Sequence, residues 1–370
     1  MTCDPMLLAA PGVRTLVPYQ PGKPLDELER ELGIKNAIKL ASNENPYGPS
    51  PAALAAIAGT LEAAARYPDG GAFTLKRALA RHFDIDPACI TLGNGSNDVL
   101  ELAARTFLAP GEIAMCDQYA FAVYPIVVRA VGGQMLTVKS RDFGHDLEAM
   151  GAALTPAVRM VFLANPNNPT GTSFGRPALE RFLSVCPDTT LVVLDEAYFE
   201  YVAGHDHPDG RSLLGQHDNL IVVRTFSKAY GLAGLRAGYS LSSAAVAGLM
   251  NRVRQPFNVS TPAQAAAVAA LADQQYMSMV VARNNEAREA MRTQLHTRGY
   301  AVLPSAGNFL CIEVGDGAAA YEALLRQGVI VRPLDPYGMP RHIRVTIGTP
   351  AENERFLQAL DFVTRAAHGA

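Results

Sequence analysis

Lys228 stands in a sequence context that predicts a reactive amine. It comes shortly after the apolar run Leu220–Val223 and just before Gly231. Such a run predicts a buried strand that delivers the lysine at its C-terminal end. Most loop lysines are solvated, but an amine that is partly desolvated there loses preference for its charged form and becomes a nucleophile toward carbonyl groups. The neighbouring residues decide between these two interpretations.

Two residues near Lys228 could bind a phosphate group. Ser227 supplies a hydroxyl, and Arg236 supplies a planar guanidinium that can bind phosphate through two parallel hydrogen bonds. A lysine beside a phosphate site is typical of proteins that hold pyridoxal phosphate (PLP) as a Schiff base. We therefore expect PLP as the cofactor and Lys228 as its covalent partner.

Polar and aromatic residues at other strand ends could contact the PLP ring. The ring is an electron sink only while its nitrogen is protonated, which requires a carboxylate, and Asp195 directly follows the apolar run Leu191–Leu194. Tyr198 and Asn168 could reach the phenolic oxygen of the ring, and Tyr119 could stack on it. Three of these residues also have ordinary structural explanations: a helix N-cap for Asp195, a turn residue for Asn168 and a core aromatic for Tyr119.

A glycine-rich turn is the candidate for the main phosphate site. Gly95, Ser96 and Asn97 lead into an apolar helical stretch, and the backbone N–H groups at a helix start bind phosphate. The turn also resembles the dinucleotide-binding fingerprint. However, Asp98 replaces the third glycine and no long strand–turn–helix unit is expected before the turn, so an NAD site is not expected.

Two other kinds of site are also not expected. Leu191–Glu196 resembles the magnesium-binding strand of an ATPase, but Gly22-Lys23 lacks the first glycine of a phosphate-binding loop. His205 and His207 could bind a metal, but Pro208-Asp209-Gly210 favours a solvated turn. We therefore expect no metal.

The alternation of elements predicts an α/β fold. Short runs rich in Val, Ile and Leu alternate with helical stretches such as 96–108 and 176–184, as in a parallel sheet covered on both faces. The polar residues should meet at one edge, because the carboxyl ends of parallel strands lie together. The expected strands are Ile113–Cys116, Gln134–Val138, Met160–Ala164, Leu191–Leu194, Leu220–Val223 and Ala237–Leu241.

The last third of the chain has a different pattern. A long helical stretch, 263–297, precedes short strands at 309–314, 329–332 and 343–347, which predicts a smaller α+β domain. The first 50 residues are rich in Pro and Gly and should wrap onto the small domain or a partner subunit. We therefore expect a large domain of residues 51–254 and a small domain of residues 1–50 and 255–370.

The composition is that of a soluble enzyme. The chain has 370 residues, 49 % hydrophobic and 18 % charged, which is enough for about two domains. A formal net charge of −3 argues against a nucleic-acid surface, and no apolar run approaches the roughly 20 residues of a membrane span. The N-terminus lacks the basic region of a signal peptide, and the five cysteines form no Cys-x-x-Cys pair. A cytoplasmic location is expected.

Several motifs together resemble those of the fold-type-I PLP-dependent aminotransferases, specifically the histidinol-phosphate aminotransferases. The resemblance runs from about Pro18 to Glu354. It implies a large domain with a mostly parallel sheet and a smaller α+β domain. The motifs are Pro18–Lys23, Asn43–Pro49, Arg66–Asp69, Asn165–Gly171, Asp195–Tyr198, Ser227–Arg236 and Arg344–Gly348.

The resemblance also implies a role for each candidate residue. Lys228 would hold PLP and move the substrate proton, while Asp195 would pair with the ring nitrogen. Tyr67 would reach the PLP phosphate of a partner subunit, so a homodimer is implied. The other cofactor contacts would be Gly95, Ser96, Asn97, Tyr119, Asn168, Tyr198, Ser227 and Arg236, and the substrate contacts would be Tyr19, Asn45, Arg332 and Arg344. Many relatives carry an acidic residue where this chain has Asn97.

The implied reaction moves an amino group between L-histidinol phosphate and 2-oxoglutarate, a step of histidine biosynthesis. Arginine suits this exchange because a guanidinium binds carboxylate and phosphate alike. Three alternatives remain open: an aromatic amino-acid aminotransferase acting on phenylalanine or tyrosine, a PLP-dependent decarboxylase of an amino-acid phosphate, and a transcription regulator with a PLP-fold effector domain. Such regulators carry an added helix-turn-helix module, whereas this chain begins almost at the catalytic fold.

Overall fold

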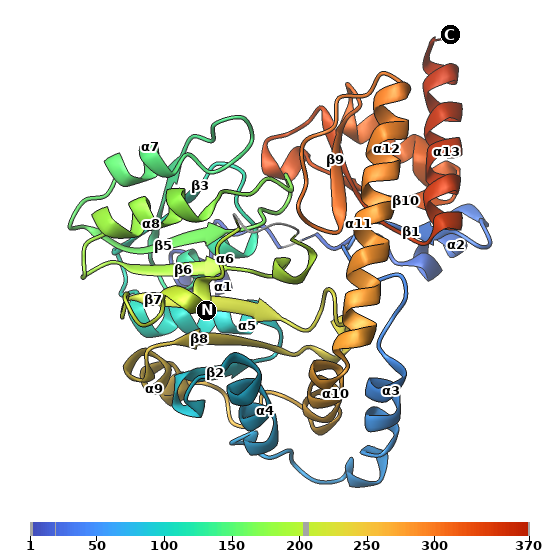
Figure 1. The fold of residues 1–370 in the computed structure, drawn as a ribbon. Coiled ribbons are helices and arrows are strands. Elements are labelled where there is room, and N and C mark those ends of the chain that lie inside the picture. The colour runs from blue at the N-terminus through green and yellow to red at the C-terminus, as the bar shows by residue number, and fades with distance from the viewer. Residues whose placement is uncertain (1–2, 19, 203–206, 369–370) are drawn as a thin grey trace.

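A seven-stranded sheet forms the centre of the larger of two lobes (Figure 1). The computed structural model describes residues 3–18, 20–202 and 207–368. The strand order is β2-β8-β7-β6-β5-β3-β4. The strands are β2 (Ile90–Gly93), β3 (Ile113–Asp117), β4 (Gln134–Val138), β5 (Val158–Ala164), β6 (Leu191–Asp195), β7 (Leu220–Thr225) and β8 (Gly238–Ser242).

The sheet is mixed but mostly parallel, as expected. Strand β8 runs antiparallel to β2 and β7, and the other neighbouring pairs are parallel. The carboxyl ends of β3, β5, β6 and β7 therefore share one edge, and the loops that follow them carry the predicted site residues. Strand β2 was not predicted. This strand of four residues leads through the glycine-rich turn into α5 (Ser96–Phe107).

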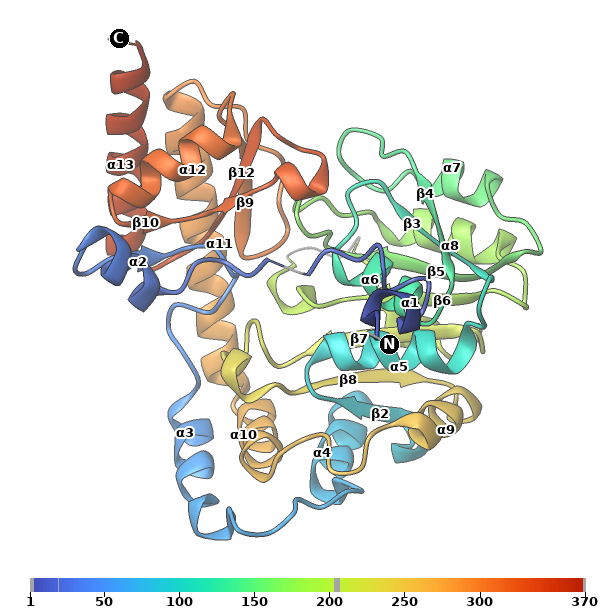
Figure 2. The ribbon, with the colours of Figure 1, turned by 180° about the vertical axis from the view of Figure 1, so that it is seen from behind.

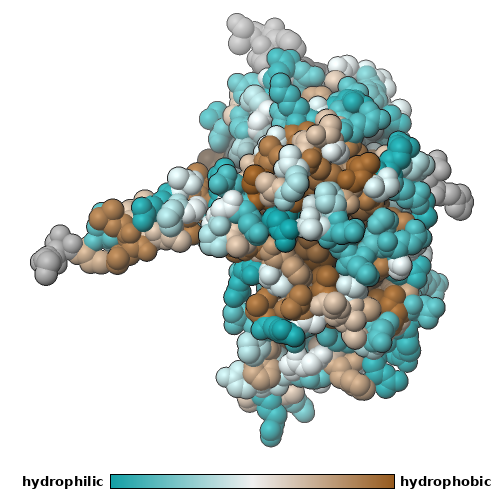
Figure 3. Space-filling model, turned by 90° about the vertical axis from the view of Figure 1, so that its left-hand side faces the viewer, coloured by the Kyte–Doolittle hydropathy of each residue, from teal (hydrophilic) through white to brown (hydrophobic). Residues whose placement is uncertain are grey.

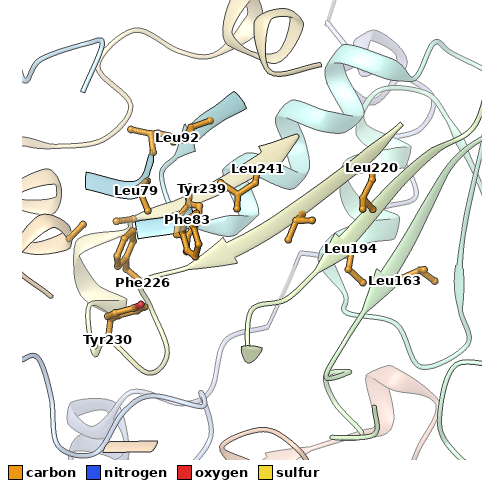
Figure 4. Close-up of a cluster of buried hydrophobic side chains, with 14 of the residues drawn as sticks. Leu79, Phe83, Leu92, Leu163, Leu194, Leu220, Phe226, Tyr230, Tyr239 and Leu241 are labelled. Carbon is orange, nitrogen blue, oxygen red and sulfur yellow. The ribbon is translucent and has the colours of Figure 1, made fainter. Parts of the chain in front are cut away.

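Helices cover both faces of the sheet. One face packs on α5 (Ser96–Phe107), α6 (Val123–Ala130) and α9 (Ala244–Val253). The other packs on α4 (Phe73–Phe83), α7 (Leu147–Ala152), α8 (Arg176–Val185) and α10 (Thr261–Ala272). Figure 4 shows part of this second core, where Leu163, Leu194 and Leu220 project from β5, β6 and β7. Strands buried on both faces explain the nearly continuous apolar runs in the sequence.

The smaller lobe contains the second sheet, in the order β11-β12-β9. These antiparallel strands are β9 (Phe309–Glu313), β11 (Arg332–Pro333) and β12 (His342–Thr346). Strand β1 (Ile38–Lys39) pairs with β10 (Val329–Ile330), which ties the N-terminal segment to this lobe. The accompanying helices are α11 (Gln274–Thr297), α12 (Gly317–Arg326) and α13 (Pro350–His368).

The helical stretch expected at 263–297 is two helices, α10 and α11. They separate at Asp273, whose carboxylate accepts a hydrogen bond from the Tyr276 N–H (3.1 Å) and so caps α11. Helix α10 packs against α3 (Pro51–Ala58) and α4, and so lies with the larger lobe. The division of the chain at residues 50 and 254 stays a prediction.

The N-terminal segment lies against the end of α6 (Figure 2). An added Cβ at Gly12 would lie 2.0 Å from the Arg129 carbonyl oxygen, so only glycine fits there. The segment includes α1 (Pro5–Leu8) and is followed by α2 (Leu25–Leu32). It projects as an arm with apolar atoms on its surface (Figure 3), and Leu7 and Leu8 are 70 % and 76 % exposed.

Short 3₁₀ helices complete the structure: η1 (Leu61–Ala63), η2 (Pro87–Cys89), η3 (Phe199–Tyr201), η4 (Gly210–Leu213), η5 (Ala233–Leu235) and η6 (Asp335–Tyr337). Among the described ranges, no helix combines the length and the apolar character needed to cross a membrane.

Candidate active site

A cavity of about 180 Å³ lies where the carboxyl edge of the large sheet faces the small lobe. Its walls come from the loops after β5, β6 and β7, from the start of α5 and from β12. The structure brings many of the predicted residues together there, namely Ser96, Asn97, Asn168, Asp195, Tyr198, Ser227, Lys228, Arg236 and Arg344.

The Lys228 amine is held inside this cavity. Its Nζ donates a hydrogen bond to the Ser42 carbonyl oxygen (3.2 Å) and lies 5.6 Å from the centre of the Tyr198 ring. Burial lowers the pKa of Lys228 to about 7, and the positive charges of Arg344 and Arg236 act in the same direction. A large fraction of the amine is therefore neutral and nucleophilic near neutral pH.

Asp195, the last residue of β6, is held by two hydrogen bonds. Its Oδ2 accepts from the Tyr124 hydroxyl (2.7 Å), and its Oδ1 accepts from the Ala197 N–H (3.1 Å). Burial raises the pKa of Asp195 to about 6, although the two hydrogen bonds and Lys228 oppose this effect. The group is therefore mainly a carboxylate at neutral pH, and its orientation is fixed.

Tyr198 presents a neutral phenol to the cavity. Burial raises its pKa to about 12, and its hydroxyl oxygen accepts a hydrogen bond from Asn43 Nδ2 (2.8 Å). The phenol can therefore donate a hydrogen bond to a negatively charged oxygen in the cavity.

Arg344 reaches across from β12. Its Nη1 donates to the Asn168 side-chain oxygen, and its Nη2 donates to the Ala41 carbonyl oxygen (2.6 Å). Its Nε is buried and has no hydrogen-bond partner among the described residues. A buried donor of this kind is costly unless a partner such as an anion satisfies it.

The turn between β2 and α5 forms a concave site for an anion. Gly95 has a φ of +80°, and an added Cβ there would lie 2.2 Å from Arg236 Nη2, so the guanidinium packs directly on the turn. Arg236 Nη1 also donates to Ser227 Oγ (3.3 Å). A helix start, a hydroxyl and a guanidinium thus converge, which is the donor set of a phosphate site.

These residues fit PLP. The cavity contains a nucleophilic amine, a buried carboxylate for the ring nitrogen, a phenol beside an amide, and an anion site at a helix start. In a site for PLP, Lys228 would bind the aldehyde carbon, Asp195 the ring nitrogen and Arg236 the phosphate.

The structure does not bring Tyr119 to the cavity. Its ring instead stacks on Phe143, with centroids 5.5 Å apart and 23° between the planes. Phe121 and Tyr124 line the cavity in its place. Tyr119 is held away from the cavity by its stacking on Phe143, whereas Phe121 lies just before α6, which begins at Val123.

Asn45 also does not line the cavity. Its side chain donates to the Gly48 and Ala229 carbonyl oxygens (3.2 and 3.0 Å), so it braces the loop that carries Lys228. Asn43, from the same motif, and the preceding Ser42 line the cavity instead. Asn43 and Asn45 are of the same residue type, so sequence reasoning could not have chosen between them.

The remaining candidates lie outside this cavity. Arg332 lines an adjacent cavity of about 760 Å³ between the N-terminal segment and the two lobes. It is the direct β-sheet partner of Arg344, which places the two arginines side by side. Tyr67 is 82 % exposed and stacks on Phe257 with ring centroids 4.8 Å apart. Tyr19 lies outside the described residues.

Comparison with known proteins identifies the family. Residues 35–360 match the model of the family aminotransferase class I and II. Histidinol-phosphate aminotransferase 2 of Pseudomonas aeruginosa is 57 % identical to this chain over 360 residues, which cover 96 % of this chain and 98 % of that protein. The protein of the same name from Methylococcus capsulatus is 52 % identical, with 96 % and 98 % covered.

A solved structure agrees with this assignment. The crystal structure of histidinol-phosphate aminotransferase from Sinorhizobium meliloti in complex with pyridoxal-5'-phosphate has a TM-score of 0.88 to this chain. The two sequences are 34 % identical, and the match covers 96 % of this chain and 97 % of that one. This chain therefore belongs to the class I and II aminotransferases and, within them, to the histidinol-phosphate aminotransferases.

Proposed function

We propose that this chain uses PLP to transfer an amino group between L-histidinol phosphate and 2-oxoglutarate, a step of histidine biosynthesis. The observation that carries the proposal is the position of the Lys228 amine. It shares one cavity with the Asp195 carboxylate, the anion site at Arg236 and the Arg344 guanidinium. The identity of 57 % to a histidinol-phosphate aminotransferase supports this choice of substrate.

Each residue has a separate task in the transfer. PLP, when bound, supplies an electron sink for negative charge at the substrate Cα. The Lys228 amine, with a pKa lowered by burial to about 7, can take the Cα proton and give it back at another atom. The Asp195 carboxylate keeps a proton on the ring nitrogen. The Tyr198 phenol, which stays protonated, donates a hydrogen bond to the oxygen on the ring.

Arg332 and Arg344 would bind the substrate anion. They occupy directly opposite positions on β11 and β12. Like charges at such positions destabilise a sheet, whereas an anion between them reverses the effect. Glutamate offers a carboxylate and histidinol phosphate offers a phosphate, so the same pair can serve both substrates in turn.

A homodimer in the cytoplasm would complete the site. Tyr67 and Phe257 form an exposed aromatic pair, and Leu61 and Phe73 nearby in the sequence are 63 % and 64 % exposed. Large apolar side chains that are exposed, such as these four, would be stabilised by burial against a partner subunit. In that dimer Tyr67 would reach the PLP phosphate of the other subunit. The five cysteines are unpaired, which is typical of a reducing compartment.

Two measurements test the proposed function. Borohydride treatment of the protein with PLP should fix the cofactor to the peptide that contains Lys228, and a label on another peptide would refute the assignment. Turnover of histidinol phosphate and of phenylalanine should then be compared, each with 2-oxoglutarate. We expect a higher kcat/KM for histidinol phosphate, and the opposite order would make the chain an aromatic aminotransferase.

A further inference from the structure

Three aromatic side chains bridge the two lobes beside the cavity. The Tyr119 ring stacks on Phe143, both from the larger lobe. The Phe143 ring then meets His342 of β12 edge to face, with centroids 5.3 Å apart and 60° between the planes. His342 is only 7 % exposed, and Tyr119 and Phe143 are half-buried. We call Tyr119, Phe143 and His342 the aromatic bridge.

Phe143 has a backbone conformation that is unfavourable for a bulky residue. Arg141 and Gly144 exchange two backbone hydrogen bonds around a tight turn, in which Asp142 and Phe143 have φ values of 51° and 62°. A bulky side chain at positive φ is uncommon. Such a residue persists where surrounding contacts compensate, often at functional sites. The two ring contacts of Phe143 add to the two backbone hydrogen bonds of the turn as compensation.

The larger-lobe end of the bridge is attached to the turn that follows β5. Asn167 Nδ2 of this turn donates to the Tyr119 carbonyl oxygen (3.1 Å), and Thr172 Oγ1 donates to the Phe143 carbonyl oxygen (3.2 Å). Asn167 and Thr172 are both buried. The backbones of Tyr119 and Phe143 therefore move together with this turn.

The same turn meets the small lobe a second time, through Asn168 and Arg344. Arg344 and His342 are two residues apart on β12, so their side chains leave the same face of the strand. We propose that Phe143 is a positioning residue: the aromatic bridge sets where β12 presents Arg344 to the cavity. This rests on the role proposed above for Arg344 as an anchor of the substrate anion.

The variant Phe143→Gly removes the ring without straining the turn, because glycine adopts positive φ freely. Asp142→Gly is the matched control, since it relaxes the neighbouring residue of the same turn and keeps the ring. Phe143→Tyr keeps an aromatic ring at the bridge. All three should be compared with the unaltered chain as PLP-loaded enzymes, in which the anion site at Arg236 is already occupied by the PLP phosphate.

Phe143→Gly should raise KM for histidinol phosphate by about 2- to 10-fold and leave kcat nearly unchanged, because anion binding and not proton transfer depends on the bridge. The Kd of inorganic phosphate, measured by calorimetry on the loaded enzyme, should rise by the same factor. Asp142→Gly and Phe143→Tyr should match the unaltered chain in both measurements, and PLP affinity should be the same in all four proteins.

Three outcomes would overturn the proposal. These are unchanged KM and phosphate Kd in Phe143→Gly, equal effects in Asp142→Gly and Phe143→Gly, or loss of PLP binding, which would indicate a structural role. The phosphate measurement keeps the two proposals apart. If the unaltered chain does not turn over histidinol phosphate, the proposed function fails, whereas the comparison of phosphate Kd values still decides whether the bridge positions Arg344.

Discussion

The Lys228 amine owes its reactivity to its surroundings. Burial in the cavity is the main cause of its lowered pKa, and Arg344 is the second. Arg344 comes from the small lobe, so the charge that prepares the lysine also belongs to the proposed substrate anchor. Nucleophile and anchor are thus coupled electrostatically before any substrate binds.

The lowered pKa of Lys228 predicts how PLP capture depends on pH. Only the neutral amine attacks the aldehyde, so the rate of covalent capture by the PLP-free protein should rise with pH and level off above about pH 8. Stopped-flow absorbance at a series of pH values measures this rate. A lysine at its ordinary pKa of 10.5 would instead give a rate that still rises at about pH 10. Arg344→Gln should move the midpoint upward, because it removes a positive charge near the amine.

Arg344→Lys tests the anchor while keeping the charge. Lysine lacks the planar fork, so the loss of charge-assisted hydrogen bonds should cost on the order of 1.5–3 kcal/mol in transition-state binding, or roughly 10- to 100-fold in kcat/KM. Steady-state kinetics should show the loss for both glutamate and histidinol phosphate. PLP absorbance and Tm should barely change. A lowered Tm with unaltered kinetics would instead indicate that Arg344 only ties the lobes together through Asn168.

At the scale of elements, β2 and α5 position the phosphate site. The strand ends at Gly93, the chain turns through Gly95, and α5 begins at Ser96. Strand β8 pairs with β2, and an added Cβ at Gly238 would lie 2.5 Å from the Ser96 backbone nitrogen. The backbone of β8 thus packs too closely on the turn for any side chain at Gly238. Because no side chain is present there, the start of α5 has room for a phosphate.

Gly95→Ala should weaken PLP binding and leave the fold intact. An alanine Cβ would meet the Arg236 guanidinium at 2.2 Å, and a φ of +80° is unfavourable for alanine. The turn or Arg236 must shift, so we expect the Kd of PLP to rise by about tenfold or more, which corresponds to the 1–2 kcal/mol of a strained residue. Fluorescence titration of the PLP-free protein measures this. Gly111→Ala is the control, because it has a similar φ of +87° with open space around the position. Equal effects on PLP affinity in both variants would contradict the explanation.

At the scale of the whole molecule, the site is assembled from two lobes and a proposed partner. The larger lobe supplies Lys228 and Asp195, and the smaller lobe supplies Arg344. Tyr67 remains exposed to solvent in the single chain. We propose that the exposed aromatic pair of Tyr67 and Phe257 lies in the subunit interface.

Mixed dimers test whether the site is shared. Lys228→Ala and Tyr67→Ala chains should each be strongly impaired alone. If Tyr67 acts on the partner's PLP, one site of each mixed dimer carries both defects and the other carries neither, so activity should return after subunit exchange. The recovered rate should approach about a quarter of that of the unaltered enzyme, because half of the dimers are mixed and each has one intact site. Demonstrated exchange without recovery would count against a shared site.

The sequence alone was sufficient for the local features of this protein. Apolar runs predicted most strands of the large sheet. Asp195, which directly follows one run, and Lys228, which comes shortly after another, reach the cavity as expected. The prediction succeeds because a strand that is buried on both faces is apolar along its whole length. The end of the apolar run therefore marks the carboxyl end of the strand, where ligands bind in such sheets. The resemblance of several motifs to those of a known family predicted the family of this chain, and the comparisons confirm it.

The tertiary structure decided which way side chains point in the connecting loops. Tyr119 and Phe121 are both aromatic and follow the same strand, yet only Phe121 lines the cavity. Asn43 and Asn45 differ in the same way. The direction of a loop side chain depends on contacts with residues far away in the sequence, such as Phe143 for Tyr119. Such contacts leave no local pattern in the sequence, because they form only once segments far apart in the chain have packed together.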